Sequence, residues 1–287
     1  MSSSDPGPSS LTVQPLHPRL GAEILGVDLD VVDDELFEQI YTAFVRYKMV
    51  VFRDQNLSSA GQVAFARRFG TVQVHVLNQY HLTEFPELYF LSNLDADGNP
   101  SGEHPDPGTA YWHTDGSWTK RTTIATMIYS VEAPKVGGQT EFADMAAAYE
   151  SFDPQEQVRL AQLSAIHNLD FSRKQRQGET PLTEEQKLQV PPVEHPVVRT
   201  HPDSGLRCLY LGDHAESIVG MDYDEGRALI EDLNKRSVRP ELVYAHSWHP
   251  NELVVWDNRS VLHRAAPYDT AHERRVMRRA TVLGPPV

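Results

Sequence analysis

The sequence predicts a mainly β protein with helices, an α+β chain whose core is a double-stranded β-helix, the distorted jelly roll, with a helical covering and an insert. Apolar runs of strand length recur along the chain, and helical patterns interrupt them. The chain also has 20 prolines and 17 glycines, which supply the many turns that short strands need. Its candidate metal ligands lie far apart in the sequence, and antiparallel sheets that fold over one another bring distant strands to one barrel mouth.

Two helices and a strand are expected near the start of the chain. Acidic residues at 33–35 precede apolar residues at helical spacing, which predicts a helix over 34–45. The apolar run 48–52 that follows predicts a buried strand, and Ser58 with Ser59 begins a second predicted helix. Further strands are predicted over 111–117, 124–131, 206–211, 242–248, 253–256 and 275–283, and further helices over 145–152, 155–163 and 224–235.

One domain is expected from residue 11 to residue 287. Residues 1–10 are rich in Ser, Pro and Gly, which predicts a disordered tail, and they lack the apolar segment of a signal peptide. An insert is expected around residues 165–195, within which 178–192 is polar, charged and then proline-bearing. That segment is a candidate lid. Arg173 and Lys174 just before it could reach a bound anion from the insert, but a solvated charge run is the preferred interpretation.

The composition excludes several classes of partner. Forty acidic and 26 basic residues give a net charge of −14, which repels nucleic acid and anionic membrane surfaces. No apolar run approaches the roughly 20 residues that cross a bilayer. The only cysteine, Cys208, cannot form an internal disulfide and belongs to no CxxC pattern, which predicts a reducing, cytoplasmic location.

Three residues form a candidate metal site. On a strand, residues i and i+2 point to one face, so His113-Thr114-Asp115 would aim an imidazole and a carboxylate the same way. His263, beyond the apolar run 252–256, is the candidate third ligand. Two imidazoles and one carboxylate leave the opposite face of an octahedron open for a bidentate co-substrate and O2, which is typical of non-heme Fe(II) oxygenases. Because the chain has 13 histidines, a chance His-x-Asp triplet is the competing interpretation.

Two other functions remain open for the same residues. Two histidines and an aspartate can hold Zn²⁺ with an activated water, as in a Zn-dependent hydrolase. A non-catalytic jelly-roll binding module is the third hypothesis. The intact triad disfavours it, because inward-facing charges are costly without a metal or other partners.

Seven passages of the chain together resemble the Fe(II)- and 2-oxoglutarate-dependent taurine/dichlorophenoxyacetate dioxygenase family. They are residues 51–55, 65–70, 112–115, 137–140, 199–202, 256–259 with His263, and 274–281, and the likeness covers nearly all of 11–283. The resemblance implies that His113, Asp115 and His263 bind Fe(II), and that Arg275 and Thr140 bind 2-oxoglutarate, with O2 as the other co-substrate. It also implies a homo-oligomer, either a dimer or a tetramer.

The resemblance extends to the primary substrate, a small organic anion that becomes hydroxylated. Strand parity puts Arg275 and Arg279 on one inward face, and the resemblance assigns Arg279 to a carboxylate or sulfonate of the substrate. The other substrate-pocket candidates are His75, Asn78, Thr109, Gly116 and His214.

Two departures from the taurine enzyme bear on the identity of this anion. That enzyme has a tyrosine and an asparagine where this chain has Asn78 and Thr109. Residues 197–269 are closer to the branch of the family that cleaves aryloxyalkanoates. An aryloxyalkanoate-type substrate, cleaved at a C–O bond, is therefore expected, and a taurine or alkylsulfonate dioxygenase is the alternative.

Overall fold

The core of the protein is a large twisted sheet, seen in a computed structural model that describes residues 11–74, 82–177 and 179–285. Within these residues the sheet has the strand order β1-β2-β3-β14-β6-β16-β4, and β5 also pairs with β16. Only β2 and β3 pair in parallel among its described strands. The strands are β1 (Thr12–Pro15), β2 (Ala22–Leu25), β3 (Met49–Phe52), β4 (Thr71–Val72), β5 (Tyr89–Ser92), β6 (Thr123–Glu132), β14 (Glu252–Asp257) and β16 (Val276–Leu283).

A smaller antiparallel sheet packs on one face of the large sheet. Its strand order is β13-β7-β15, with β7 (Thr140–Asp144), β13 (Val243–His246) and β15 (Val261–Ala265). The two sheets share a buried apolar cluster in which Phe142 of β7 packs with Trp256 of β14 and Met277 of β16. Two sheets folded over one core form the double-stranded β-helix, so the predicted fold class is confirmed.

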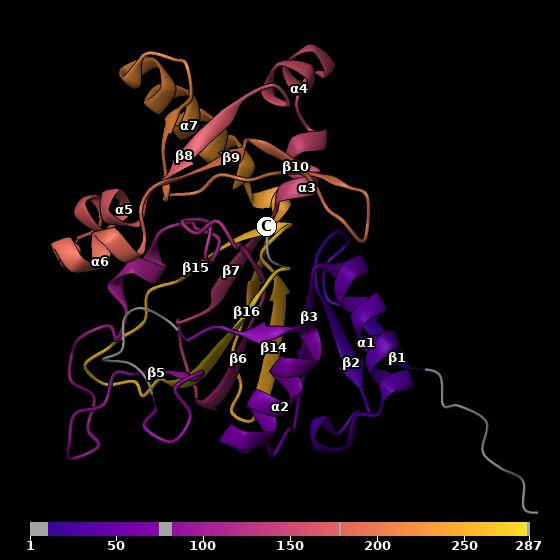
Figure 1. Cartoon of the computed structure of the whole chain (residues 1–287). Coiled ribbons are helices and arrows are strands. Elements are labelled where there is room, and N and C mark those ends of the chain that lie inside the picture. Colours follow the sequence, from indigo (N-terminus) through magenta and orange to yellow (C-terminus); the bar gives the residue numbers. More distant parts are fainter. Residues whose placement is uncertain (1–10, 75–81, 178, 286–287) are drawn as a thin grey trace, which may run out of the picture.

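Helices α1 (Asp34–Tyr47) and α2 (Ser59–Phe69) cover the other face of the large sheet (Figure 1). Each begins as the sequence predicts, because the side chains of Asp33 and Ser58 cap their first turns. Strand alternation divides the sheet residues between the two faces. In β16, Ala280 and Val282 pack under these helices, whereas Met277 faces the small sheet.

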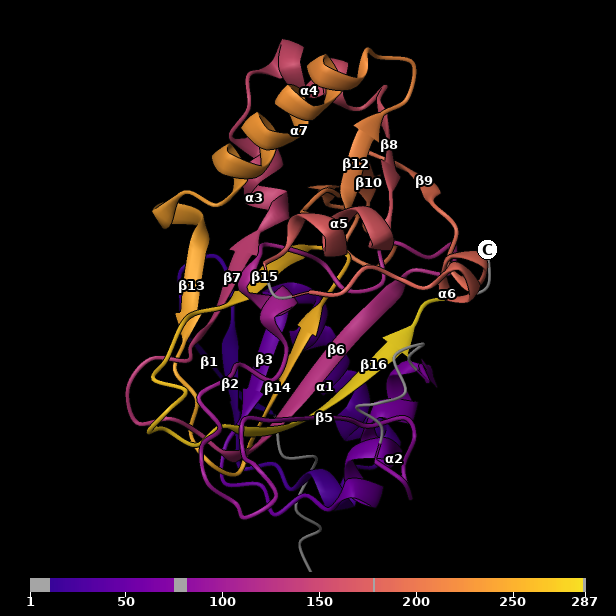
Figure 2. The ribbon, with the colours of Figure 1, turned by 90° about the vertical axis from the view of Figure 1, so that its left-hand side faces the viewer.

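The chain between β7 and β13 builds a cap over one end of the two sheets (Figure 2). Strands β12-β8-β9 form one antiparallel sheet there, and β10 pairs with β11. The strands are β8 (Ser164–His167), β9 (Val193–Pro196), β10 (Val198–Thr200), β11 (Arg207–Leu209) and β12 (Ala215–Ile218). The helices are α3 (Met145–Glu150), α4 (Pro154–Leu160), α5 (Leu169–Gln175), α6 (Glu184–Gln189) and α7 (Tyr223–Ser237). Short 3-10 helices lie at η1 (Leu29–Val31), η3 (Pro107–Ala110) and η4 (Pro240–Leu242).

One local prediction was wrong. Residues 111–117 do not form a strand, because the chain turns at 115–117, where Gly116 has a φ of +65°. The described part of the candidate lid, 179–192, contains α6, whose first turn Thr183 caps. Leu182 before this helix is buried against Trp118 and Leu169. None of the described helices is long and apolar enough to cross a membrane.

Candidate metal centre and its two pockets

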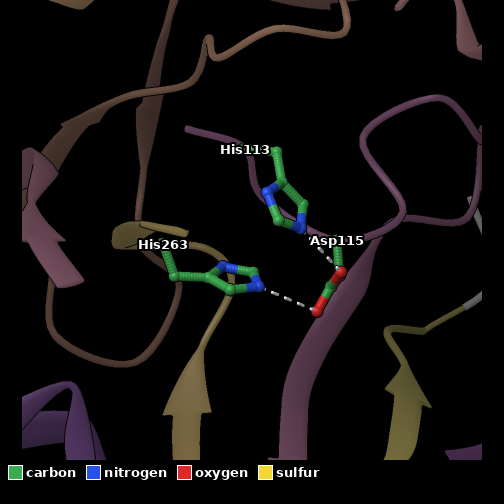
Figure 3. Close-up of side chains that lie close together, drawn as sticks. All are labelled: His113, Asp115 and His263. Atoms are coloured by element: carbon green, nitrogen blue, oxygen red, sulfur yellow. Dashed lines mark ion pairs between the residues drawn. The ribbon is translucent and has the colours of Figure 1, made fainter. Parts of the chain in front are cut away.

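His113, Asp115 and His263 converge inside the jelly roll, where both imidazoles point at the carboxylate (Figure 3). His113 Nε2 lies 3.7 Å from Asp115 Oδ1, and His263 Nε2 lies 3.6 Å from Asp115 Oδ2. All three side chains are buried. In the part of the chain that the structure describes, this is the one group of three or more such side chains with ligand atoms close enough to share a metal ion.

The loop that carries His113 and Asp115 is held by a single β-bridge and a threonine side chain rather than by a regular strand. His113 pairs with His263 in a single β-bridge, which joins the ligand loop to β15. Between the two ligands, Thr114 turns the other way, and its Oγ1 donates a hydrogen bond of 2.7 Å to the carbonyl oxygen of Asn258. His113 and Asp115 therefore share a face, as the i and i+2 argument expects, although the strand is absent.

Both imidazoles are in the form that binds a metal. Burial, followed by the neighbouring His263, lowers the pKa of His113 to about 4, and burial also lowers the pKa of His263 to about 4. His113 Nδ1 lies 2.7 Å from the carbonyl oxygen of Tyr111, so Nδ1 carries the proton and donates it. The lone pair of Nε2 is then free on the side that faces Asp115.

The Asp115 carboxylate is ionised and fixed in orientation. Burial alone would raise its pKa, but Arg279, His263 and His113 outweigh burial and hold the pKa of Asp115 well below its usual range. Arg279 Nη2 donates to Oδ1 at 2.7 Å. Thr126 of β6 donates from Oγ1 to Oδ2 at 2.6 Å.

A chain of hydrogen bonds fixes Thr126 in turn. Asn258 Nδ2 donates to Thr126 Oγ1 at 2.9 Å, and Trp256 Nε1 donates to Asn258 Oδ1 at 3.1 Å. Because Thr126 Oγ1 accepts this hydrogen bond from Asn258, its own hydroxyl hydrogen points to Asp115. Two imidazole nitrogens and an oriented carboxylate make a donor set that fits Fe(II) in the two-histidine, one-carboxylate arrangement.

A pocket opens beside His263 and contains a buried cation. Arg275 is 4% exposed, and within the described residues its guanidinium makes no ion pair and no side-chain hydrogen bond. Thr140 Oγ1 accepts a hydrogen bond of 3.0 Å from Trp248 Nε1, so its own hydrogen is free to donate. The pocket is lined by Leu91, His104, Pro105, Thr109, Ile128, Thr140, Trp256, His263, Ala265, Arg275 and Arg279.

A second, more polar pocket lies on the Asp115 side of the centre. His214 is buried there, and its Nδ1 lies 2.8 Å from Ser172 Oγ. Since the Ser172 hydroxyl donates to the carbonyl oxygen of Leu169, His214 Nδ1 is the donor to Ser172. The pocket is lined by Gln73, Tyr89, Asp106, Asp115, Gly116, Trp118, Leu169, Arg173, Arg176, Glu179, His214 and Arg279.

The candidate substrate residues divide between the two pockets. Thr109 lies in the first pocket, Gly116 and His214 lie in the second, and Arg279 borders both. His75 and Asn78 lie outside the described residues.

The cap also contributes side chains to the second pocket. Arg173 is not part of a solvated charge run, because its side chain is 12% exposed and lies 2.5 Å from Glu179. Arg176 and Glu179 line the same pocket, and no motif in the sequence singles them out. Lys174 is half-exposed, as expected, and pairs with Asp170.

Comparison with known proteins decides the family. A family model described as "Taurine catabolism dioxygenase TauD, TfdA family" matches residues 12–281. The chain belongs to this family. It is therefore a 2-oxoglutarate-dependent dioxygenase, and family membership implies Fe(II) as its metal and 2-oxoglutarate as its co-substrate. The hydrolase and binding-module hypotheses are correspondingly disfavoured.

Relatives in the TauD/TfdA family match along almost the whole chain. The alpha-ketoglutarate-dependent 2,4-dichlorophenoxyacetate dioxygenase of Cupriavidus pinatubonensis is 36% identical, over 96% of this chain and 98% of its own. The (S)-phenoxypropionate/alpha-ketoglutarate-dioxygenase of Sphingobium herbicidovorans is 32% identical, over 96% and 95%. The crystal structure of AAD-2 with Mn(II) and N-oxalylglycine is 33% identical and superposes with a TM-score of 0.83, over 97% and 99%.

Proposed function

We propose that this enzyme oxidises a small organic carboxylate of the aryloxyalkanoate kind, with Fe(II) bound by His113, Asp115 and His263. The observation that carries the proposal is Arg275, a buried cation beside His263 without an anionic partner in the described chain. Leaving such a charge unpaired is costly. The distal carboxylate of 2-oxoglutarate would neutralise it through a bidentate, charge-assisted contact.

The residues of the first pocket would orient and isolate the co-substrate. Arg275 fixes its distal carboxylate, and the Thr140 hydroxyl donates a further hydrogen bond. Apolar side chains on the pocket wall, Leu91, Ile128 and Trp256, exclude water. Fe(II), when bound, supplies the redox chemistry by which 2-oxoglutarate and O2 yield succinate and CO2 while one oxygen atom enters a substrate C–H bond.

The second pocket would hold the primary substrate. Arg279 is proposed to neutralise the substrate anion, which its position between the two pockets supports. His75, Asn78, Gly116 and His214 are the other candidate contacts there, and Thr109 would contact the substrate from the first pocket. Hydroxylation of a carbon that bears an ether oxygen gives a hemiacetal. Its collapse breaks the C–O bond, forms a carbonyl, and passes the hydroxyl proton to the departing phenolate oxygen.

The known activities of the two curated relatives support a carboxylate-bearing substrate. Their names specify 2,4-dichlorophenoxyacetate and (S)-phenoxypropionate, which are both aryloxyalkanoates. We further infer a single domain over 11–287, a cytoplasmic location and a homo-oligomer, either a dimer or a tetramer. The buried free thiol of Cys208 is compatible with a reducing compartment. Light scattering on the purified protein tests the oligomeric state.

An anaerobic visible difference spectrum tests the metal and co-substrate assignments. A weak charge-transfer band should form only when both Fe(II) and 2-oxoglutarate are present, and it should be absent from His113→Ala. Succinate release should then respond to phenoxyacetates more strongly than to alkylsulfonates. Absence of the band, with tight retention of Zn²⁺, would instead support the hydrolase hypothesis.

A further inference from the structure

Arg176 is a second buried arginine at the substrate pocket, and it comes from the cap rather than from the jelly roll. It follows the last turn of α5 and lies in the same pocket as Asp115, Arg279 and His214. Its side chain is only 8% exposed. A guanidinium this deeply buried needs an acceptor for each of its N–H groups.

The contacts of Arg176 leave both of its terminal nitrogens without a hydrogen-bond acceptor among the described residues. Nε donates to Asp213 Oδ2 at 2.6 Å. Nη1 lies 3.9 Å from Glu179 Oε1, which is an ion-pair distance but too long for a hydrogen bond. Nη2 is fully enclosed and has no hydrogen-bond partner among the described residues.

The other two arginines of this pocket are already paired. Arg173 contacts Glu179 at 2.5 Å, and Arg279 Nη2 is hydrogen-bonded to Asp115 at 2.7 Å. Arg176 is thus the arginine of this pocket with a fully buried terminal nitrogen that has no acceptor among the described residues.

Residues on two sides of Arg176 determine the position of its guanidinium. The backbone N–H of Asp213 donates to the carbonyl oxygen of Trp112, next to the ligand His113, so the acceptor of Arg176 is tied to the metal loop. On the other side lies Gly108. A Cβ at this position would lie 2.3 Å from Glu179 Oε1 and 2.5 Å from Arg176 Nη1, so a larger residue would force the ends of these two side chains to shift.

We propose that Arg176 binds the anionic group of the primary substrate through the terminal N–H groups of its guanidinium and selects charged over neutral substrates. The inference rests on the proposed function, because it assumes that the Asp115-side pocket holds the substrate. It adds a specificity-determining residue that is carried by the cap. Arg279 and Arg176 would then approach one carboxylate from the barrel and from the cap.

The test is calorimetric binding to the full-length protein loaded with Mn(II) and N-oxalylglycine, which involves no turnover. The probes are 2,4-dichlorophenoxyacetate, its neutral primary amide, and an alkyl sulfate. Arg176→Met should weaken binding of 2,4-dichlorophenoxyacetate by about tenfold to hundredfold, the usual worth of a hydrogen bond to a charged group. Binding of the amide and of N-oxalylglycine should not change. Lys174→Met, two residues before Arg176 but half-exposed and outside the pocket, is the matched control and should bind all probes normally.

Gly108→Ala gives an independent version of the test, because it displaces the guanidinium without removing it. It should weaken binding of the acid but not of the amide. The inference is overturned if Arg176→Met binds the acid as tightly as the wild type, or if it loses the acid, the amide and N-oxalylglycine together. It is also overturned if the wild type binds N-oxalylglycine but neither anionic probe. Failure of the wild type to bind N-oxalylglycine in the presence of Mn(II) is the separate result that rejects the proposed co-substrate site.

Discussion

His113 and His263 hold each other in place through their backbones. The N–H of His113 donates to the carbonyl oxygen of His263 at 3.0 Å, and the N–H of His263 donates to that of His113 at 2.8 Å. The backbones of these two proposed ligands, which come from distant parts of the chain, are thus fixed as one unit without a metal. The third proposed ligand, Asp115, is positioned separately, by the Thr126 side chain of the large sheet and by Asn258 behind it. Its orientation should therefore change more readily on mutation than the orientation of the two histidines.

Removal of the Thr126 hydroxyl should weaken metal binding. Thr126→Val keeps the shape of the side chain but leaves Asp115 Oδ2 without its 2.6 Å donor. We expect about a 10- to 100-fold loss of Mn(II) affinity, the usual effect of removing a group that orients a metal ligand. Competition with a chelator measures this loss. Thr42→Val on the exposed side of α1 is the control, and equal affinities for both variants would refute the role of Thr126.

Loss of the Arg275 guanidinium should affect the co-substrate and little else. Arg275→Met should raise the concentration of 2-oxoglutarate needed for half-maximal turnover by about 100-fold or more, because a bidentate charge-assisted contact disappears. The adjacent Arg274 offers a matched control, since it is exposed and pairs with Glu132 on the surface. If Arg275→Met and Arg274→Met require the same 2-oxoglutarate concentration, another cation binds the distal carboxylate.

The shared face of His113 and Asp115 and the inward side of β16 could be predicted from the sequence, because both depend on local pattern. The spacing of His113 and Asp115 puts both side chains on one side of the chain. Alternation along β16 puts Met277 and Ala280 on opposite faces of the sheet. The predicted strand over 111–117 failed for an equally local reason. Gly116 takes a left-handed φ of +65° and turns the chain before a strand can form.

The cap was predicted least well, because its site residues depend on partners distant in sequence. Arg176 is held in the pocket by its hydrogen bond to Asp213, and the absence of a side chain at Gly108 leaves space for its guanidinium. Neither relationship has a signature in the sequence. The start of α6 could have been found. Thr183 and Gln186 form a capping box, a pattern that marks a helix start even in a polar segment.

A buried ion-pair network should make Asp257 important for stability rather than for catalysis. Its carboxylate accepts hydrogen bonds from Arg259 and from His201 Nε2, all within 3 Å, and it is fully buried. Asp257→Asn should lower the free energy of unfolding by about 3 kcal/mol, since it leaves a buried cation poorly compensated. Urea denaturation measures this change. Asp203→Asn, at the exposed end of the same network, should cost less than 1 kcal/mol.

His167 should make the folded state sensitive to acid. It is fully buried on β8, neither ring nitrogen has a partner among the described residues, and burial, followed by His195, lowers the pKa of His167 well below its usual value. The unfolded chain therefore binds a proton near pH 6.5 that the folded chain does not, so stability falls as the pH drops below about 6.5.

Replacement of His167 isolates its share of this acid sensitivity. Between pH 7.5 and pH 5 a histidine that stays neutral when folded accounts for a loss of about 2 kcal/mol. In His167→Phe the decrease in unfolding free energy between these pH values, measured by urea denaturation, should be smaller than in the wild type by up to that amount. Because each protein is compared with itself, any packing cost of the phenyl ring cancels. His272→Phe, at an exposed histidine, should retain the wild-type decrease. An identical decrease in His167→Phe would mean that the buried imidazole is protonated in the folded state.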